Sequence, residues 1–568
     1  MFTRRATLAA GAGLAAAPAM AGDRPLGRAF AGRSAVYAKD GMVATSQPLA
    51  TAAGLAVLKQ GGSAIDAAIA ANACLGVMEP TGCGVGGDLF AIVWDPKTAK
   101  LHAINASGPA PRGQTLAQAA ARAKGPIIPP LGVRCATVPG AVDGWLQLHA
   151  KFGKLRLSDV LQPAIGYARD GHPVAPIIAQ GWARNFSRFE QGRADIEEFD
   201  NAKKAWLIGG RAPRAGEMFA NPDLARTYTN IAVYGRDWFY EGDGADILDR
   251  YMQRVGGPLT KADMAAYRAQ WVEPISTRYR GVDVFQIPPN SQGLTVLQIL
   301  NILEGFDLQA MGFGSADALH VAAEAKKLAF ADRARFIADP DFARLPVAQL
   351  LDKSYAARQR ATIKMDRATP ARDIKGYAGG DTIYMCAADK SGMMVSLIQS
   401  NYRGMGSGIV PDGLGFMLQN RGSQFNLNPA HANVYAPGKR PFHTIIPGFA
   451  MKGGQPWLAF GVMGGDMQPQ GHAQIMTNLV DFGMDVQEAG DAPRWRDIGG
   501  PDADGSDGAE TLYLESQIGA DVRKALVARG HVMASGYQDV GGYQAIAREG
   551  GVFIGASEMR KDGMAAGY

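Results

Sequence analysis

The sequence predicts an α+β fold in which helices cover a core of two β-sheets. Residues 150–370 carry mostly helical patterns, whereas the chain from residue 379 onward reads as short strands separated by glycine turns. One further strand pair is predicted early, within residues 81–111. A chain of 568 residues is too long for one small core, because single cores stop growing at about 250–300 residues. The chain therefore forms several domains or one large fused sandwich of helices and sheets.

Two helices open the ordered part of the chain. The segment QPLATAAGLAVLKQGG, just after Ser46, predicts a helix that ends at Gly61-Gly62, where glycine favours a C-cap. The next segment, SAIDAAIAANACLGVMEP, predicts a second helix with Ser63 as its N-cap and Pro80 beyond its end.

A glycine loop and a hairpin follow these helices. Residues 82–87 match the spacing G-x-G-x-x-G, but a helix precedes them and a strand follows, the reverse of a dinucleotide site. Asp95-Pro96 marks the hairpin turn. Farther along, residues 317–342 predict the clearest amphipathic helix, and a helix near residues 471–482 interrupts the later strands.

The first 21 residues resemble an export signal rather than part of the fold. Arg4-Arg5 precedes an apolar run that is too short to span a bilayer, and Ala19-Met20-Ala21 forms a small-x-small cleavage site. The paired arginines are typical of twin-arginine export. The mature protein is therefore expected to begin near Gly22 and to work in the periplasm or outside the cell.

Composition excludes several classes of function. The net charge is only +5, and no basic run is interleaved with aromatic residues, so a nucleic-acid partner is not expected. No second apolar run suggests a membrane span. The eight histidines form no ligand-like pairs, so neither a metal nor another cofactor is expected. The cysteine spacing matches no zinc pattern and leaves disulfides and buried free thiols both open; the four are Cys74, Cys83, Cys135 and Cys386.

A predicted hairpin at residues 379–404 places two hydroxyl groups together. Its sequence is GGDTIYMCAADKSGMMVSLIQSNYRG, with the turn at DKSG. Depending on the length of that turn, Thr382 lies opposite Gln399 or Ser400, and cross-strand neighbours lie about 5 Å apart at Cβ. Such a Thr–Ser pair is usually structural.

Thr382 becomes a catalyst if it becomes a chain terminus. Its own α-amine, with an unperturbed pKa of about 7.7–8.0, then acts as the base for its hydroxyl. This requires cleavage between Asp381 and Thr382, which the threonine hydroxyl can perform on the preceding carbonyl group. Other hydrolase chemistries have little support, because the sequence contains no G-x-S-x-G elbow, H-E-x-x-H or C-x-x-C motif.

Many ordered segments resemble the γ-glutamyltransferase family of N-terminal-nucleophile hydrolases. They include MEPTGCGVGGDLF, ATVPGAVDGW, IPPNSQGLTVLQILNILEGFDL, the strand pair at Thr382, GSGIVPDGLGFMLQN, KRPFHTIIP and VMGGD. The resemblance implies a four-layer αββα sandwich built jointly by two chains cut from one precursor. The large, helix-rich chain would comprise residues 22–381, and the small chain residues 382–568 would begin with the nucleophile.

The resemblance also assigns roles to individual residues. It makes Thr382 the nucleophile, places Ser400 where the family has a threonine that hydrogen-bonds the nucleophile, and places Gly464 and Gly465 in the oxyanion hole. Preorganised donors of this kind each stabilise a developing oxyanion by about 2.7–4 kcal/mol. Five further residues fall at substrate-binding positions of the family: Ser107, Tyr402, Gln424, His443 and Thr444.

These five positions depart from the family pattern. Ser107 replaces an arginine that pairs with the donor's α-carboxylate, and Gln424 replaces an aspartate that holds its α-ammonium group, so the γ-glutamyl clamp is largely missing. Typical members also carry Thr-Thr-His where this chain has TIY. Arg112 could replace the missing arginine or could be a solvated surface residue. His443 and Asp466 could contact substrate or be satisfied polar groups beside the site.

The segment GGDMQPQGH resembles the branch that contains oxamate amidohydrolases and acylases. We therefore expect a small amide substrate whose acyl group passes to Thr382 and then to water or an amine. A true γ-glutamyltransferase or glutathione hydrolase is the alternative within this class. An uncut binding protein with the same fold is the alternative from another class.

Overall fold

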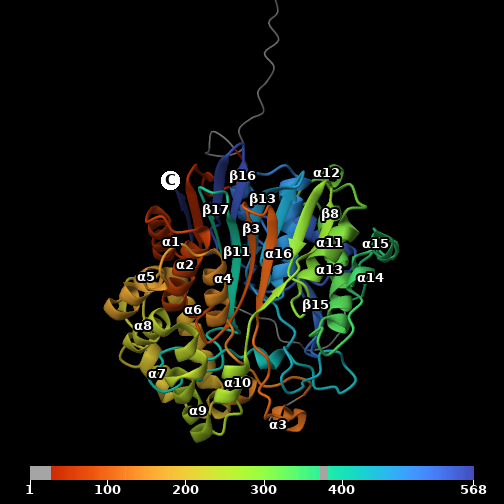
Figure 1. The fold of residues 1–568 in the computed structure, drawn as a ribbon. Coiled ribbons are helices and arrows are strands. Elements are labelled where there is room, and N and C mark those ends of the chain that lie inside the picture. The colour runs from red at the N-terminus through yellow and green to blue at the C-terminus, as the bar shows by residue number, and fades with distance from the viewer. Residues whose placement is uncertain (1–26, 122, 124, 371–380) are drawn as a thin grey trace, which may run out of the picture.

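The computed structural model describes residues 27–121, 123, 125–370 and 381–568. Two seven-stranded antiparallel sheets face each other, and helices cover the outer face of each (Figure 1). This arrangement confirms the predicted four-layer αββα sandwich. The predicted export signal lies outside the described residues, so export remains a prediction. Within the described part of the chain, no helix combines the length and hydropathy needed to cross a bilayer.

The first sheet carries the hairpin that contains Thr382. Its strand order is β18 (Met564–Gly567), β2 (Gly41–Thr45), β10 (Asp381–Asp389), β11 (Met394–Tyr402), β3 (Asp88–Asp95), β4 (Lys100–Ala106) and β7 (Gln270–Val272). The hairpin β10–β11 therefore lies between strands β2 and β3, which precede Thr382 by hundreds of residues in sequence.

The second sheet is interleaved in the same way. Its strand order is β1 (Val36–Ala38), β17 (Val552–Ser557), β16 (Tyr543–Glu549), β13 (Gln455–Val462), β12 (Gly448–Lys452), β9 (Val282–Gln286) and β8 (Ile275–Tyr279). Two small two-stranded sheets pair β14 (Trp495–Pro501) with β15 (Asp507–Leu514), and β5 (His172–Pro173) with β6 (Met218–Phe219). Segments from before and after Thr382 thus contribute to both large sheets.

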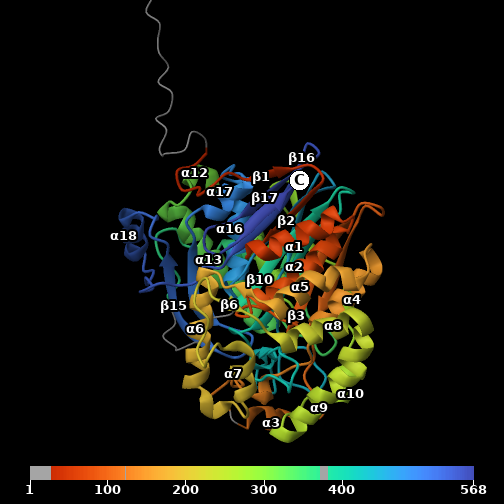
Figure 2. The same ribbon diagram turned by 90° about the vertical axis from the view of Figure 1, so that its left-hand side faces the viewer.

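One helix layer covers the first sheet, as Figure 2 shows for α1, α2, α4 and α5. Its helices, with those that extend it below the sheet, are α1 (Pro48–Lys59), α2 (Ala64–Met78), α3 (Leu116–Ala120), α4 (Ala141–Phe152), α5 (Leu157–Asp170), α6 (Pro176–Gln191), α7 (Asp200–Trp206), α8 (Pro222–Arg236), α9 (Asp243–Val255) and α10 (Lys261–Ala266). Every residue of α2 is buried, because this helix lies between the sheet and the other helices.

The second helix group lies on the side of the other sheet. Its members are α11 (Gly293–Leu303), α12 (Leu308–Met311), α13 (Ala316–Phe336), α14 (Val347–Leu351), α15 (Lys353–Arg360), α16 (Met467–Val480), α17 (Val486–Asp491) and α18 (Ala520–Ala528). An apolar cluster that includes Phe90, Ile398 and Phe449 fills the space between the two sheets.

The local signals at α1 and α2 are confirmed. The Gln47 side chain caps α1, and Gly61 follows its end with φ = 94°, a value that favours glycine. Ser63 caps α2 in a reciprocal capping box with Asp66. Helix α13 ends six residues earlier than predicted, because Pro340 disfavours helical backbone at Asp339 and the chain is already extended at Ile337.

The strands β7, β8 and β9 lie inside the region predicted to be mostly helical, so that prediction was wrong there. Residues of β8 and β9 alternate between buried and more exposed positions. Arg280 and Gly281 connect them with positive φ values of 46° and 87°, which is typical of a two-residue hairpin turn. The alternation and the Arg-Gly turn were visible in the sequence.

Candidate active site

The hairpin β10–β11 brings the two predicted hydroxyl groups together. Thr382 and Ser400 are both buried, and their hydroxyl oxygens are 3.3 Å apart. The strand register shifts between Asp381 and Ile383, so a bulge displaces Thr382 from regular pairing. Bulges of this kind re-aim a side chain next to a functional site.

Ser400 also contacts the peptide bond that precedes Thr382. Its hydroxyl donates a hydrogen bond to the carbonyl oxygen of Asp381 at 2.8 Å and accepts one from the backbone N–H of Tyr402 at 2.8 Å. A donor on this carbonyl oxygen polarises the carbon that Thr382 would attack. Tyr402 itself has φ = 76°, an uncommon value for a bulky residue that is found where surrounding structure enforces it.

The glycine loop before β3 packs directly against this hairpin. The carbonyl oxygen of Gly82 accepts a hydrogen bond from the N–H of Asn401 at 3.2 Å. A Cβ atom on Gly87 would lie 2.5 Å from the carbonyl oxygen of Ser400. These glycines are therefore required for close backbone approach, not for binding a dinucleotide.

The predicted oxyanion-hole glycines lie in the loop after β13. Gly464 and Gly465 have φ values of 106° and 58°, and no partner of their N–H groups is found among the described residues. The adjacent Gln468 is buried, and its amide nitrogen lies 3.5 Å from the Thr382 hydroxyl. Its amide oxygen accepts a hydrogen bond from the N–H of Ile446 at 3.0 Å. Gln468 was not among the residues predicted from the sequence.

Ser107 and His443, two predicted substrate-binding residues, are buried in one polar network. The Ser107 hydroxyl donates to the side-chain oxygen of Asn105 at 2.6 Å and accepts from Asn290 at 3.2 Å. His443 donates from Nε2 to Asp88 at 2.9 Å. Burial, and then the positive charge of Arg421, hold the pKa of His443 well below its usual value. His443 is therefore a neutral, satisfied side chain in this network.

Asp88 organises this network from the start of β3. Its Oδ1 accepts from the N–H groups of Gly108 and Gly140 and from the side chain of Gln419, at 2.9, 3.2 and 2.9 Å. Its Oδ2 accepts from His443. Burial raises the pKa of Asp88 to about 7. Four donors therefore occupy this carboxyl group before any substrate binds.

Two of the other three predicted substrate-binding residues, Tyr402 and Thr444, contact Arg421, which was not predicted from the sequence. Gln424, the third, lies at the end of the short 3-10 helix that begins at Arg421. The Arg421 guanidinium lies 4.4 Å from the centre of the Tyr402 ring and donates to the Thr444 hydroxyl at 2.8 Å. The side-chain oxygen of Gln424 is buried without a partner among the described residues.

Asp466 and Arg112 have structural roles in this arrangement. Asp466 forms an ion pair with Arg333 at 2.7 Å, and Arg333 also donates to Gln292 at 2.7 Å. Although burial acts to raise the pKa of Asp466, Arg333 lowers it below its usual value. Arg112 is exposed, and its backbone N–H donates to Asp263. The solvated interpretation of Arg112 is therefore favoured.

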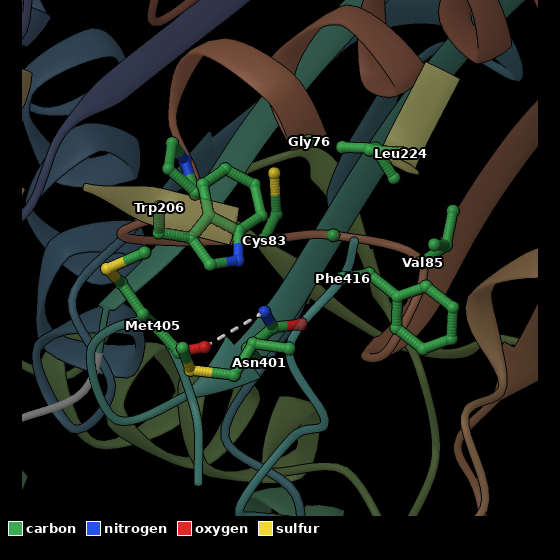
Figure 3. Close-up of a pocket in the computed structure, with 11 residues that line it drawn as sticks. Gly76, Cys83, Val85, Trp206, Leu224, Asn401, Met405 and Phe416 are labelled. Carbon is green, nitrogen blue, oxygen red and sulfur yellow. Dashed lines mark hydrogen bonds between the residues drawn. The ribbon is translucent and has the colours of Figure 1, made fainter. Parts of the chain in front are cut away.

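A cavity near the glycine loop lies on the other face of the hairpin (Figure 3). Its lining is mostly apolar and includes Cys83, Trp206, Phe416 and the amide of Asn401, which donates to the carbonyl oxygen of Met405 at 3.3 Å. Ser400 and Asn401 are consecutive strand residues and so point to opposite faces. The cavity therefore faces the helix layer, away from the Ser400 hydroxyl.

All four cysteines are buried and free, which settles the question left open by their spacing. Burial raises the pKa of each thiol above its usual value. None of them is therefore activated as a thiolate nucleophile.

One side-chain cluster in the described residues could hold a metal ion. The ligand atoms of His320, Glu324 and His531 lie within 4.8 Å of one another. However, His320 and His531 hydrogen-bond each other at 2.8 Å, and Glu324 binds Lys327 and Thr369. These groups satisfy one another, and the sequence could not show the pair because its members are 211 residues apart.

Comparison with known proteins agrees with this architecture. The gamma-glutamyltranspeptidase family profile matches residues 50–568. A cephalosporin acylase crystal structure from Bacillus halodurans is 43% identical, with a TM-score of 0.87 over 94% of this chain and 97% of that one.

Two curated relatives are similar over nearly their whole length. The glutathione hydrolase-like YwrD proenzyme of Bacillus subtilis is 37% identical over 93% of this chain and 98% of its own. The oxamate amidohydrolase proenzyme of Klebsiella pneumoniae is 36% identical, with the same coverage. Both are proenzymes, which implies a large and a small chain from one precursor. This chain therefore belongs to the gamma-glutamyltranspeptidase family and is a self-processing N-terminal-nucleophile amidohydrolase of its divergent, acylase-like branch.

Proposed function

We propose that the precursor cuts itself between Asp381 and Thr382, and that Thr382 then transfers the acyl group of a small amide to water. The observation that carries this proposal is the position of Ser400. Its hydroxyl lies 3.3 Å from the Thr382 hydroxyl and simultaneously donates to the carbonyl oxygen of Asp381. The Ser400 side chain therefore contacts both the attacking hydroxyl group and the carbonyl group of the bond to be cut.

In self-cleavage, the Thr382 oxygen attacks the carbonyl carbon of Asp381. The carbon–nitrogen bond breaks, the Thr382 nitrogen takes up the hydroxyl proton and becomes an amine, and an ester links Asp381 to the Thr382 oxygen. Water then hydrolyses this ester, which leaves Asp381 with a new carboxyl group and restores the hydroxyl. Ser400 stabilises the negative charge that develops on the Asp381 oxygen.

In turnover, the free α-amine of Thr382 accepts the proton of its own hydroxyl as the oxygen attacks the substrate amide. Backbone N–H groups of Gly464 and Gly465 stabilise the tetrahedral oxyanion. The amine product leaves with a proton from the α-ammonium group, and an acyl ester remains on Thr382. Water attacks that ester with the α-amine as base, which releases the acid and regenerates the enzyme.

The substrate class follows from what surrounds the nucleophile. Ser107 and Gln424 supply neither the arginine nor the aspartate of a γ-glutamyl clamp, and Asn105 and Asn290 already satisfy Ser107. The oxamate amidohydrolase and cephalosporin acylase relatives support simpler amide donors. We therefore favour an acylase or amidohydrolase activity over transfer of γ-glutamyl groups. A γ-glutamyl anilide hydrolysed more efficiently than simple acyl anilides would reverse this preference.

The decisive experiment compares wild-type protein with Thr382→Ala. Wild type should run as two chains on a denaturing gel, and N-terminal sequencing of the smaller chain should give Thr-Ile-Tyr-Met. Thr382→Ala should remain one uncut, folded chain without amidase activity. A wild-type protein that is also uncut and inactive would instead support a non-catalytic binding protein.

A further inference from the structure

Gln468 connects the loop that carries Gly464 and Gly465 to the nucleophile. It lies in the first turn of α16, where its backbone N–H donates to the carbonyl oxygen of Gly465 at 3.1 Å. Its side chain is fully buried, and the amide nitrogen lies 3.5 Å from the hydroxyl oxygen of Thr382. Gln468 therefore contacts the predicted oxyanion-hole loop through its backbone and the reacting oxygen atom through its side chain.

The contact with Ile446 determines which end of the Gln468 amide faces Thr382. The backbone N–H of Ile446 can only donate, and it lies 3.0 Å from the side-chain oxygen of Gln468. The amide oxygen must therefore point to Ile446, and the amide nitrogen, which only donates, must point to Thr382. Exchanging the two amide atoms would place two donors face to face at Ile446.

The contacts of Ser400 determine the direction of the Thr382 hydroxyl. A serine hydroxyl has one proton to donate and two lone pairs that accept. Ser400 donates its proton to the carbonyl oxygen of Asp381 and uses one lone pair for the N–H of Tyr402. Toward Thr382, at 3.3 Å, Ser400 can therefore only accept. The Thr382 proton points to Ser400, and Gln468 faces a lone pair of the attacking oxygen.

We propose that Gln468 is a further catalytic residue, whose amide N–H stabilises the negative charge that develops on the Thr382 hydroxyl oxygen. This proposal rests on the function proposed above and adds one group to its machinery. The amide keeps its proton throughout the reaction. The distance of 3.5 Å should shorten as charge develops, because hydrogen bonds to ionised groups are shorter and roughly twice as strong as neutral ones.

The same N–H acts at both ends of turnover. When the Thr382 oxygen attacks the substrate amide, its proton passes to the α-amine, a carbon–oxygen bond forms, and Gln468 stabilises the oxygen as it loses that proton. When water hydrolyses the acyl ester, that carbon–oxygen bond breaks and the oxygen takes a proton back from the α-ammonium group. Gln468 then stabilises the leaving oxygen. The N–H groups of Gly464 and Gly465 act on a different atom, the carbonyl oxygen of the substrate.

The first test measures self-cleavage and turnover in Gln468→Met, which retains the bulk of the side chain but removes its N–H. Turnover is followed with whichever of the acetyl, glutaryl and γ-glutamyl p-nitroanilides wild type hydrolyses fastest. Thr382 attacks in both reactions, so we expect both rates to fall by about 10- to 100-fold, the contribution of a hydrogen bond to a charged group. The loss should be equal in kcat and kcat/KM, because the interaction strengthens only as charge develops. Wild-type rates, or a rise in KM alone, would overturn the proposal.

Gln468→Glu gives a pH signature that a structural role would not produce. A protonated glutamic acid keeps both functions, because its carbonyl oxygen accepts from Ile446 and its O–H donates to Thr382. The ionised form has no proton to donate and repels the developing charge. The activity of Gln468→Glu divided by that of wild type should therefore fall as the pH rises through the pKa of the new carboxyl group. A ratio that stays constant with pH would contradict the proposal.

Gln474→Met is the matched control on the same helix. Gln474 is buried, but its side-chain nitrogen donates to the carbonyl oxygens of Gln470 and Trp495 instead of the nucleophile. Its loss should lower the melting temperature, because buried hydrogen bonds are removed, and leave kcat, KM and the rate of self-cleavage unchanged. Equal slowing in Gln474→Met and Gln468→Met would show that a loosened α16 explains the effect, and would refute the proposal.

Failure of this inference is distinguishable from failure of the proposed function. If wild type stays uncut and mass spectrometry finds no acyl ester on Thr382, the proposed function is wrong and the inference falls with it. If wild type is cut and active and the Gln468 variants match it, only the role of Gln468 is wrong. Should Gln468→Met misfold, the pH dependence of Gln468→Glu decides, since glutamate retains the acceptor for Ile446. Should a folded variant cut too slowly to assay turnover, its self-cleavage rate relative to Gln474→Met decides.

Discussion

Removing the Ser400 hydroxyl should slow self-cleavage strongly. In Ser400→Ala, the carbonyl oxygen of Asp381 loses the donor that lies at 2.8 Å. Loss of one oxyanion donor costs about 2.7–4 kcal/mol, which corresponds to about 10²–10³-fold in rate. The N–H of Tyr402 also loses its acceptor, which costs a further 1–3 kcal/mol, roughly, of folding stability because the group is buried.

The assay follows the appearance of the small chain on a denaturing gel after cell-free synthesis, so that the uncut precursor is seen from the start. Ser400→Thr should restore cleavage, because threonine retains the hydroxyl. Ser396→Ala is the matched control: Ser396 is equally buried on the same strand but hydrogen-bonds the Tyr384 hydroxyl at 2.8 Å. It should lose stability without slowing cleavage.

Cleavage of Ser400→Ala at the wild-type rate would refute the reasoning. So would equal slowing of Ser396→Ala, since the effect would then report general destabilisation of the hairpin. Circular dichroism of both uncut proteins distinguishes a folded, slow precursor from a misfolded one.

Two further predictions concern packing and pH. Gly87→Ala should block folding or self-cleavage, because the new Cβ would lie 2.5 Å from the Ser400 carbonyl oxygen. Gly113→Ala is the control and should be tolerated, because no atom lies within 4 Å of its new Cβ. Soluble yield and the extent of cleavage measure both effects, and equal tolerance of the two variants would contradict the prediction. Burial lowers the pKa of His472 to about 3. Below pH of about 6.5 the unfolded chain therefore binds a proton that the folded protein excludes, and stability falls by about 1.4 kcal/mol per pH unit until the pH reaches about 3. In uncut Thr382→Ala protein, adding His472→Asn should reduce the fall in melting temperature between pH 6.5 and 4; an unchanged fall would contradict this assignment.

Local chemistry made the centre of the site predictable from sequence. The DKSG turn limits the expected partner of Thr382 to Gln399 or Ser400, and in the structure the Thr382 and Ser400 hydroxyl groups lie 3.3 Å apart. The glycine pairs at 86–87 and 464–465 are visible in the sequence, and in the structure Gly87 lies against the Ser400 backbone while Gly464 and Gly465 have positive φ values.

Arg421 and Asp88 could not be predicted in the same way. Each is a single charged residue in a glycine-rich segment without periodicity, and its importance depends on burial and on partners hundreds of residues away. The sequence signal that could have indicated Arg421 is that it is the one charged residue in the stretch GLGFMLQNRGSQF. Strands β8 and β9 were missed for a different reason, because helices on both sides dominated the pattern of that region.

The interleaving of strands has a consequence for how the enzyme can be made. Strands β10 and β11 are held between β2 and β3, and β12 lies beside β9, so the two chains produced by the cut share both large sheets. Before the cut, these strands pair within a single molecule. After the cut, refolding from denaturant requires two chains to associate, so its rate depends on protein concentration. Neither chain alone contains all the strands of either large sheet. We therefore expect the uncut precursor to refold more efficiently than the processed enzyme, which must reassemble two separate chains.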